Sequence, residues 1–183
     1  MSEDRIQANS FLARFSVLIR NILDSSDKIT RSLENEIDFV KNYLELQRFR
    51  YKNRFDFSIE IDSEMDTTMP VPKMIIQTYA ENAVKHGLFP LAKQGKLTIR
   101  VSETDGFLTI CVEDNGIGRK KAAESKTQST GKGMKIMKQY FEVFNERSDV
   151  KITFEIVDLT DENQDASGTK ISIKIPLSMQ FEL

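Results

Sequence analysis

FDFSIEID, residues 55–62, is the stretch where the hydrophobic pattern of this chain changes from a helical period to a period of two. Apolar residues occupy every second position, as in a strand that buries one face: Phe55, Phe57, Ile59 and Ile61. The pattern before this stretch predicts helices, and the pattern after it alternates between strands and helices. We therefore expect a helical segment over residues 1–51 and an α/β domain over residues 52–183.

Four more segments after this stretch have the period of strands: residues 96–103, 107–114, 150–158 and 168–177. The run TDG, residues 104–106, predicts a β-hairpin between the first two. Helices are expected over residues 70–88, with proline near the start and Gly87 near the end, and over residues 133–144. The order strand, helix, strand, strand, helix, strand, strand predicts one mixed sheet with helices on a face, an α/β two-layer sandwich.

The segment before residue 52 predicts two amphipathic helices. Residues 6–23 carry apolar side chains close to a helical period, and residues 33–51 resume that period after the turn-forming run DSSDKITRS. Ser32 or Thr30 is expected to cap the second helix. Its first turn also holds acidic residues suited to the positive end of a helix dipole: Glu34 and Glu36. A partner subunit and the following domain are both candidates for covering these helices.

Composition limits the classes of function. The chain has 183 residues, of which 39% are hydrophobic and 30% charged, and a net charge of −2. These values are typical of a soluble globular protein and give no reason to expect nucleic-acid binding. The single cysteine, Cys111, cannot form an internal disulfide, which favours a cytoplasmic setting. No apolar run approaches the roughly 18 residues of a membrane span, so membrane attachment is expected only through segments outside this chain.

ENAVKHG, residues 81–87, contains the one histidine of the chain. In a helix of about 3.6 residues per turn, an acid, an amide, a lysine and an imidazole share one face: Glu81, Asn82, Lys85 and His86. Amide and carboxylate oxygens are suitable ligands for Mg²⁺, which usually retains several waters and is also coordinated by substrate phosphates. The lysine and the imidazole could bind phosphate oxygens. This helix alone favours a simpler interpretation, a solvated face with His86 near the negative end of the dipole.

The next motif is VEDNGIG, residues 112–118, which ends a predicted strand in Asp114. Gly116 and Gly118 follow, and residues without side chains permit backbone shapes and close ligand approach that others block. A carboxylate at a strand end can accept a hydrogen bond from an amino group such as adenine N6. Taken alone, the glycine pair is equally compatible with an ordinary turn.

A second glycine pair lies in STGKGMKIM, residues 129–137, where Gly131 and Gly133 open a predicted helix. Free backbone N–H groups at a helix start bind phosphate, although the spacing matches neither the P-loop nor the dinucleotide fingerprint. The polar stretch over residues 119–130 cannot pack against a core, so we expect a mobile loop there. Its excess of lysine and arginine favours an anion nearby.

In this order ENAVKHG, DNGIG and GKGM resemble the N, G1 and G2 boxes of the GHKL ATPase superfamily, which includes gyrase, Hsp90 and MutL. LENEIDFVKNYLELQRFRY, residues 33–51, is similar to sensor histidine kinases of the LytS class. The resemblance runs from about residue 12 to residue 177. It implies a Bergerat-type α/β sandwich, preceded by two N-terminal helices, that binds Mg-ATP beneath a flexible lid.

The resemblance implies a role for each box residue. Asn82 would hold Mg²⁺, and the expected catalytic residues are Glu81, as a base or as the group that orients water or the acceptor, and Lys85. His86 would lie with Lys85 beside the phosphates. The other implied nucleotide-binding residues are Asp114, Gly116 and Gly118 at the adenine, Gly131, Lys132 and Gly133 at the phosphates, and Thr169 in support of the adenine contact.

Two features depart from the family pattern. The family often has asparagine shortly after the second G2 glycine, where this chain has Met134, Lys135 and Ile136. The phosphoacceptor of these kinases lies in an NPHFLFN-like segment, and the run ANSFLARF, residues 8–15, echoes it only superficially, with Ser10 near the expected histidine. We therefore expect the chain to begin just past the acceptor.

These observations predict the ATP-binding catalytic fragment of a dimeric sensor histidine kinase. Such a kinase would pass the γ-phosphate of ATP to its own histidine and then to a response regulator, mostly by positioning and charge stabilisation. Two alternatives stay open: a GHKL enzyme of another type, such as a serine kinase or an ATPase, and a module that binds nucleotide or a partner without turnover. The N-terminal helices favour the histidine kinase, and Glu81, Asn82 and the glycine pairs argue against an inactive module.

Overall fold

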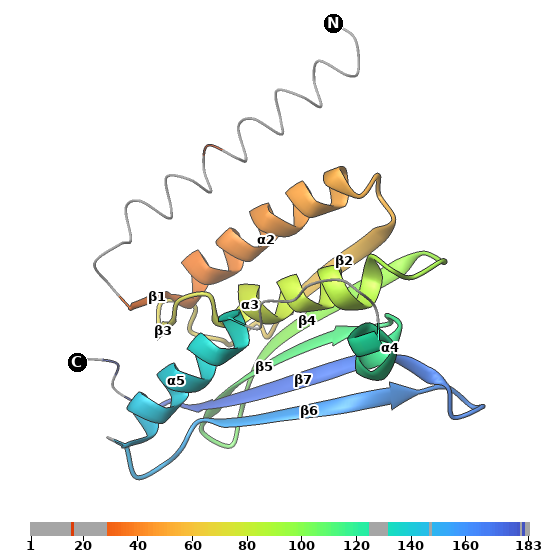
Figure 1. The fold of residues 1–183 in the computed structure, drawn as a ribbon. Coiled ribbons are helices and arrows are strands. Elements are labelled where there is room, and N and C mark those ends of the chain that lie inside the picture. Colours follow the sequence, from red (N-terminus) through yellow and green to blue (C-terminus); the bar gives the residue numbers. More distant parts are fainter. Residues whose placement is uncertain (1–15, 17–28, 125–131, 147, 180, 182–183) are drawn as a thin grey trace, which may run out of the picture.

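The computed structural model describes most of the chain from residue 29 onward, in the ranges 16, 29–124, 132–146, 148–179 and 181. The helix predicted over residues 6–23 falls outside the described residues, apart from Ser16. In the described part, helices lie over one face of a mixed β-sheet (Figure 1).

The main sheet contains five strands among the described residues, in the order β2-β4-β5-β7-β6. Their bounds are β2 (Phe55–Ile61), β4 (Gly95–Thr104), β5 (Phe107–Asp114), β6 (Thr153–Thr160) and β7 (Ala166–Pro176). β2 and β4 are parallel, and the other neighbours are antiparallel. Asp105 and Gly106 join β4 to β5 with φ values of 53° and 79°, as a two-residue hairpin turn requires. All five strands lie where the alternating pattern predicted them.

The helices are α2 (Leu33–Arg50), α3 (Ile75–Asn82), η1 (Ala83–Leu88), α4 (Gly118–Glu124) and α5 (Lys132–Glu146). α2 begins as predicted, because the Ser32 hydroxyl accepts a hydrogen bond from the Asn35 N–H at 3.3 Å. α5 covers the helix predicted over residues 133–144. In the part of the chain that the structure describes, no helix is long and apolar enough to cross a membrane.

The hydrophobic core lies between the sheet and the helices. The central strands contribute alternate residues, all buried: Leu97, Ile99, Val101, Leu108, Ile110 and Val112. The residues of α3 and η1 that a helical period places opposite the polar face are all buried: Ile76, Ala80, Ala83 and Val84. Ile75, Tyr79 and Leu88 are buried with them. Full burial of a large aliphatic side chain contributes about 1.5–3 kcal/mol. The core therefore fixes which face of α3 and η1 points away from the sheet.

The start of the helix predicted over residues 70–88 was wrong. Pro70–Pro72 forms a short strand, β3, which pairs antiparallel with β1 (Thr30–Ser32), and the helix begins at Ile75. The physical reason is that a residue before proline is pushed toward extended backbone. The chain leading into this strand also receives hydrogen bonds from the start of α2, including Leu33 N–H to the Met69 carbonyl at 2.9 Å.

The prediction of an entirely mobile loop over residues 119–130 was also wrong for its first half. Gly118–Glu124 forms α4, while residues 125–131 lie outside the described part of the chain. The basic and alanine-containing run that suggested a loop is composed of good helix formers. Arg119 holds the short helix to β6, because its guanidinium donates to both carboxylate oxygens of Asp158 at 2.6 and 2.8 Å.

Candidate functional site

The segment ENAVKHG spans a change of helix type. Glu81 and Asn82 end α3, and Lys85, His86 and Gly87 lie in η1. η1 is a π-helical turn, in which the Phe89 N–H donates to the carbonyl of Val84, five residues earlier, at 2.8 Å. Such turns are rare and frequently occur at functional sites. The extra residue in the turn also means that the segment departs from the regular 3.6-residue spacing assumed from the sequence.

Glu81 and Lys85 form an ion pair across one helical turn. Both side chains are partly exposed, at 32% for Glu81 and 45% for Lys85. An exposed pair of this kind contributes little to stability, so its main effect is to orient the two side chains. The structure thus brings together the two residues that the sequence predicted as catalytic.

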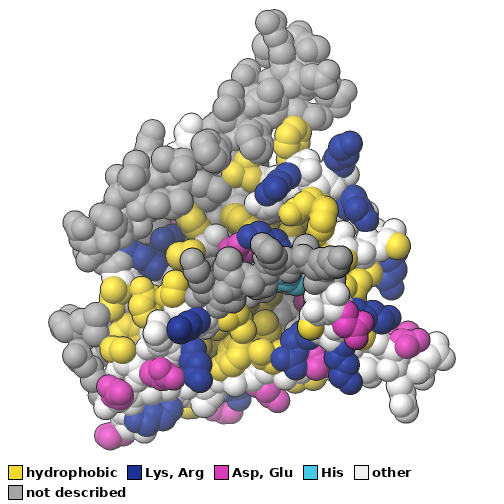
Figure 2. All heavy atoms as spheres, viewed as in Figure 1, with side chains coloured by type: hydrophobic (Ala, Val, Ile, Leu, Met, Phe, Trp, Pro, Cys, Tyr) yellow, Lys and Arg dark blue, Asp and Glu magenta, His cyan; other side chains and the backbone are white. Residues whose placement is uncertain are grey.

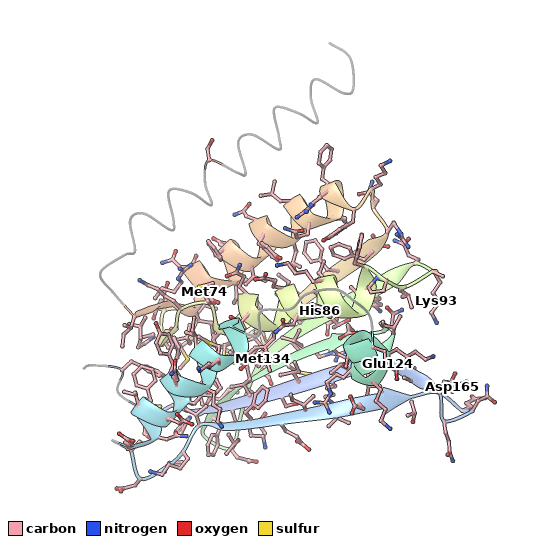
Figure 3. All side chains as sticks on the ribbon, viewed as in Figure 1. Met74, His86, Lys93, Glu124, Met134 and Asp165 are labelled. Atoms are coloured by element: carbon pink, nitrogen blue, oxygen red, sulfur yellow. The ribbon has the colours of Figure 1, made fainter. Side chains whose placement is uncertain are left out.

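His86 follows this pair on the same face of the helix. Burial lowers the pKa of its imidazole below the usual 6.5, the positive charge of Lys85 lowers it further, and Glu81 opposes both. The imidazole is therefore neutral near pH 7 and can donate or accept a hydrogen bond. In Figure 2 it lies in a recess near the middle of the face, with hydrophobic side chains on one side and charged side chains on the other. In the view of Figure 3, His86 lies between Met134 near the start of α5 and Glu124 at the end of α4.

Asp114, the last residue of β5, is a buried carboxylate that is only 6% exposed. Its Oδ1 accepts a hydrogen bond from the Gly116 N–H at 2.8 Å. Burial raises the pKa of this carboxyl group to about 6, although hydrogen bonds from the backbone N–H groups of Gly116 and Thr169 act in the opposite direction. An ionised carboxylate has about four lone-pair positions, so these donors occupy only part of its acceptor capacity.

Two glycines pack against this carboxylate. A Cβ atom on Gly87 would lie 2.7 Å from Oδ1 of Asp114, and one on Gly116 would lie 2.5 Å from the Cα of Gly87. The Ile117 N–H also donates to the Gly87 carbonyl at 3.1 Å. The backbones of η1 and of the loop after β5 therefore meet at Asp114 at a distance that a side chain would not allow. The packing role of Gly87 was not predicted, because a glycine near the end of a helix is commonly only a helix terminator. Its position within the apolar helical period could have indicated that it packs closely against another segment.

Thr169, which the resemblance assigns to the support of the adenine contact, lies beside Asp114. The two residues are directly opposite in the pairing of β5 with β7, and Thr169 is 8% exposed. Its neighbour Gly168 was missed: it has a φ of 144°, and a Cβ there would lie 1.9 Å from the Asp114 carbonyl oxygen. The backbone of β7 therefore lies against the main chain of Asp114, whereas the backbones of Gly87 and Gly116 lie against its carboxylate.

The remaining glycines are distributed differently. Gly118, with a φ of 77°, begins α4 and faces β7, because a Cβ there would lie 2.8 Å from that of Ala166. A Cβ on Gly133 would lie 3.2 Å from a methyl carbon of Thr78, so α5 begins close to α3. Gly131 lies outside the described residues, and Lys132 is placed only as the first residue of α5.

Asn115 is a further residue that the sequence analysis did not single out. Its Oδ1 accepts from the Lys96 N–H at 2.6 Å, and its own N–H donates to the Lys96 carbonyl at 3.1 Å. These bonds fix the loop after β5 to the start of β4 and so hold Gly116 in place. The asparagine within a turn sequence was the signal for such a bond.

Comparison with known families gives two matches. The pattern described as "Histidine kinase-, DNA gyrase B-, and HSP90-like ATPase" matches residues 71–179, which include every candidate site residue. The pattern described as "Histidine kinase" matches residues 1–55. The first match covers more than half of the chain.

Among curated proteins, the sensor histidine kinase YesM of Bacillus subtilis is 30% identical over 171 residues, which are 93% of this chain and 28% of YesM. The sensor histidine kinase/phosphatase LytS of Staphylococcus aureus is 36% identical over 118 residues, 63% of this chain and 20% of LytS. The chain thus spans between a fifth and just over a quarter of the length of these relatives.

Solved structures agree in fold at low sequence identity. The histidine kinase domain of the blue-light activated kinase EL346 of Erythrobacter litoralis has a TM-score of 0.55 at 17% identity, over 93% of this chain and 74% of that one. The histidine kinase AdeS of Acinetobacter baumannii has a TM-score of 0.56 at 13% identity, over 91% and 77%.

Proposed function

This chain belongs to the family of histidine kinase-, DNA gyrase B- and HSP90-like ATPases and carries the catalytic ATPase domain of a LytS- and YesM-type sensor histidine kinase; from that premise we propose how its residues bind Mg-ATP and direct the γ-phosphate. We infer that the helix-covered sheet is a sandwich of the Bergerat type. Residues 52–183 form the ATP-binding domain in this proposal. Residues 1–51 are proposed to form a helical segment that contains part of the dimerisation region of the parent protein and a linker helix.

The observation that carries the proposal is the environment of Asp114. The carboxylate is buried, partly satisfied by two backbone N–H groups, and walled by the backbones of Gly87 and Gly116, while Gly168 lies against the main-chain carbonyl of Asp114. A flat ring with an exocyclic amino group fits such a place, because the amino group can donate to the carboxylate while the ring lies against backbone. We propose that Asp114 accepts a hydrogen bond from adenine N6 and that the Thr169 hydroxyl supports this contact.

The phosphates would extend from the adenine toward η1 and the start of α5. Lys85 and the neutral imidazole of His86 lie on the outward face of η1 and can donate to phosphate oxygens. Lys132 and Gly133 begin α5, where N–H groups have no partner within the helix, and Gly131, which precedes them in the chain, would join them at the phosphates. Gly118 would act by allowing α4 to start close to β7.

The residues present fit a magnesium ion that is bound mainly through the nucleotide. Among the described residues, no cluster of three or more His, Cys, Asp or Glu side chains could hold a metal by itself. Mg²⁺ typically takes one or two protein oxygens and completes its octahedron with waters and phosphates, and Asn82 offers one amide oxygen beside Glu81. When bound, the ion would neutralise charge on the transferred phosphate.

Glu81 is the proposed base or orienting group for the attacking atom, and Lys85 holds its carboxylate in place through the ion pair. In phosphoryl transfer the attacking atom, here an imidazole nitrogen of the acceptor histidine, and the leaving oxygen of ADP lie in line on opposite sides of the γ-phosphorus. His86 lies on the face proposed to hold the phosphates, so it cannot reach the opposite side of the γ-phosphate. The acceptor is therefore a histidine that these 183 residues do not contain, and an aspartate of a response regulator would receive the phosphate next.

Calorimetric titration with ADP, with and without Mg²⁺, tests the proposal. The wild-type chain should bind ADP in a Mg²⁺-dependent manner. Asp114→Asn should weaken binding with and without the metal, whereas Asn82→Ala should abolish the gain that Mg²⁺ provides. Lys138→Ala, an exposed substitution on α5, serves as the control and should change neither. If the wild-type chain did not bind ADP, the nucleotide site would be refuted and the partner-binding alternative retained.

A further inference from the structure

Glu36 is a completely buried carboxylate on α2 that reaches across to the start of α3. Its Oε2 accepts a hydrogen bond from the Met74 N–H at 3.1 Å. Its Oε1 accepts from the N–H groups of Ile76 at 3.1 Å and Gln77 at 3.5 Å. The exposed fraction of its side chain is 0%. The glutamate that the sequence assigned to the dipole of its own helix therefore serves a different helix.

α3 depends on this carboxylate because it has no cap of its own. The first N–H groups of a helix have no partner within the helix, and a side chain at the N-cap usually accepts from one of them. The N-cap of α3 is Met74, which has a left-handed φ of 64° and no capping side chain. Glu36, which precedes it by 38 residues, supplies both the acceptors and the negative charge that the positive end of the helix favours.

Burial of the Glu36 carboxylate disfavours its charged form, so the positive charge of Arg31 beside it is important. Burial raises the pKa of Glu36, while the positive charge of Arg31 and the three backbone N–H groups lower it. The Nε atom of Arg31 lies 3.5 Å from Oε2. Arg31 is the middle residue of β1, which pairs with β3 just before α3. Strand pairing thus joins residues 30–32 to β3, and the Glu36 cap joins α2 to the start of α3. The ion pair lies within residues 29–36 and holds the Glu36 carboxylate beside β1.

α2 also contacts α3 further along its length, and the two run side by side in the same direction (Figure 1). Near the middle, burial and then the negative charge of Glu81 raise the pKa of Tyr43 above its usual value of 10. At the far end, the rings of Tyr51 and Phe89 have centroids 4.7 Å apart. The polar face with Glu81 and His86 lies between the Glu36 cap and this aromatic contact.

We propose that Glu36 is a positioning residue for the nucleotide site: its carboxylate sets the position of α3 along α2, and a displacement of residues 29–36 reaches Glu81, Asn82 and His86 through it. The consequence for ligand binding rests on the proposed function. The mechanical link from the Glu36 cap at the start of α3 to Glu81 at its end and His86 in η1 does not depend on a bound ligand.

Glu36→Gln is the informative substitution because it keeps the size of the side chain. Both oxygens of the carboxylate accept hydrogen bonds from N–H groups, whereas glutamine has one acceptor and one donor. If its oxygen faces Ile76 and Gln77, its NH₂ group meets the Met74 N–H, which loses its partner. Arg31 also loses the charge that faces it.

Two control variants isolate the effect. Glu34→Gln makes the same charge change on an exposed side chain in the same turn of α2. Ile175→Val removes a methylene from the core at the end of β7 that pairs with Leu108, far along the strand from Thr169. It lowers stability without changing any group that contacts α3 through hydrogen bonds.

The experiment measures amide hydrogen exchange over residues 74–88 and the affinity for Mg-ADP, in the full chain at a temperature where every variant is folded. Glu36→Gln should speed exchange from residue 74 through residue 86 and weaken Mg-ADP binding about tenfold, the effect of losing one hydrogen bond to a charged group. Both controls should match wild type in affinity. Faster exchange confined to residues 74–77, or an affinity equal to that of Ile175→Val, would overturn the proposal. If wild type itself bound no ADP, the proposed function would fail, and the exchange pattern would still decide the role of Glu36.

Discussion

The backbone of Gly87 lies directly against the carboxylate of Asp114, so that a Cβ atom at Gly87 would be 2.7 Å from Oδ1. Cβ atoms essentially never approach an oxygen so closely, and the carboxylate is also held by the Gly116 N–H. We expect Gly87→Ala to push η1 away from the loop after β5. Overpacking of this kind costs on the order of 1–3 kcal/mol, and nucleotide affinity should fall about tenfold or more. Urea unfolding and calorimetry measure the two effects.

Gly106→Asn is the control for that substitution. Gly106 has a φ of 79°, and no atom lies within 4 Å of the position that a Cβ would take there. Asparagine tolerates left-handed backbone better than most other side chains. The stability and ADP affinity of this variant should stay close to wild type. Equal loss of affinity in both glycine variants would contradict a specific role for Gly87.

The raised pKa of Asp114 predicts how stability depends on pH. In the unfolded chain this carboxyl group titrates near 3.8, and in the folded chain at about 6. Between these values the folded chain holds a proton that the unfolded chain has lost, so the free energy of unfolding falls as pH rises through this window. A difference of this size corresponds to on the order of 3 kcal/mol.

Urea unfolding of wild type and Asp114→Asn tests this dependence at about pH 4 and about pH 7, near the lower edge of the window and above its upper edge. The wild-type chain should lose more stability than the variant between the two conditions. Glu36 also has a raised pKa, but it is present in both chains and cancels in the comparison. An identical pH dependence in the two chains would show that Asp114 has an ordinary pKa.

Glu81→Gln should separate binding from phosphoryl transfer. The ion pair with Lys85 is partly exposed, so its loss should change the free energy of unfolding by less than about 1 kcal/mol. ADP affinity should remain similar, while transfer of phosphate to a longer chain that carries the acceptor histidine should be lost. Glu142→Gln, which removes another pair of the same spacing on α5, should leave transfer intact. Full transfer by Glu81→Gln would exclude Glu81 from catalysis.

Arg119→Ala should loosen α4. The helix has seven residues, too few to be stable alone, and the bidentate contact of Arg119 with Asp158 ties it to β6. Amide exchange over residues 119–124 should become faster while the exchange of β6 stays unchanged. Lys121→Ala alters the charge of the same helix by the same amount and provides the comparison. Equal protection of α4 in both variants would mean that other contacts hold it.

His86 should not become phosphorylated. Incubation of the chain with radiolabelled ATP should give no acid-labile, base-stable label, because the imidazole lies on the face proposed to hold the phosphates. A longer chain that contains the acceptor helix should acquire such label when mixed with this one. Label on His86 in the isolated chain would remove it from the nucleotide site.

The part of the fold that sequence could predict is the part set by short-range periodicity. The alternating residues of β4 and β5 and the period of α5 depend on which face is buried, and each can be recognised within a short window of sequence. The pairing of β1 with β3 could not be predicted, because each strand is only three residues long and carries no pattern, and the pairing joins residues as distant in the chain as Arg31 and Val71. α4 was missed because its residues do not bury an apolar face.

The candidate site shows the same division. Asp114, Gly116 and Thr169 were predicted from local motifs and from the family resemblance, and the family match confirms that resemblance. The Glu36 carboxylate could not be assigned to α3 from the sequence, because its partners lie 38 to 41 positions away and two of its bonds go to backbone N–H groups of apolar residues. The roles of Glu81, Lys85 and the phosphate-binding residues stay predictions.

Because η1 is a π-helical turn, the number of residues between Asn82 and Gly87 determines whether Gly87 faces Asp114. Deleting one residue from Ala83–Leu88 would let the turn close as an ordinary α-helix, in which each residue advances by about 100°. Gly87 would then rotate away from Asp114, and a side chain would take its place against the carboxylate. Homologous chains that keep the glycine contact are therefore expected to tolerate exchanges of residue type within this segment far more readily than any change in its length.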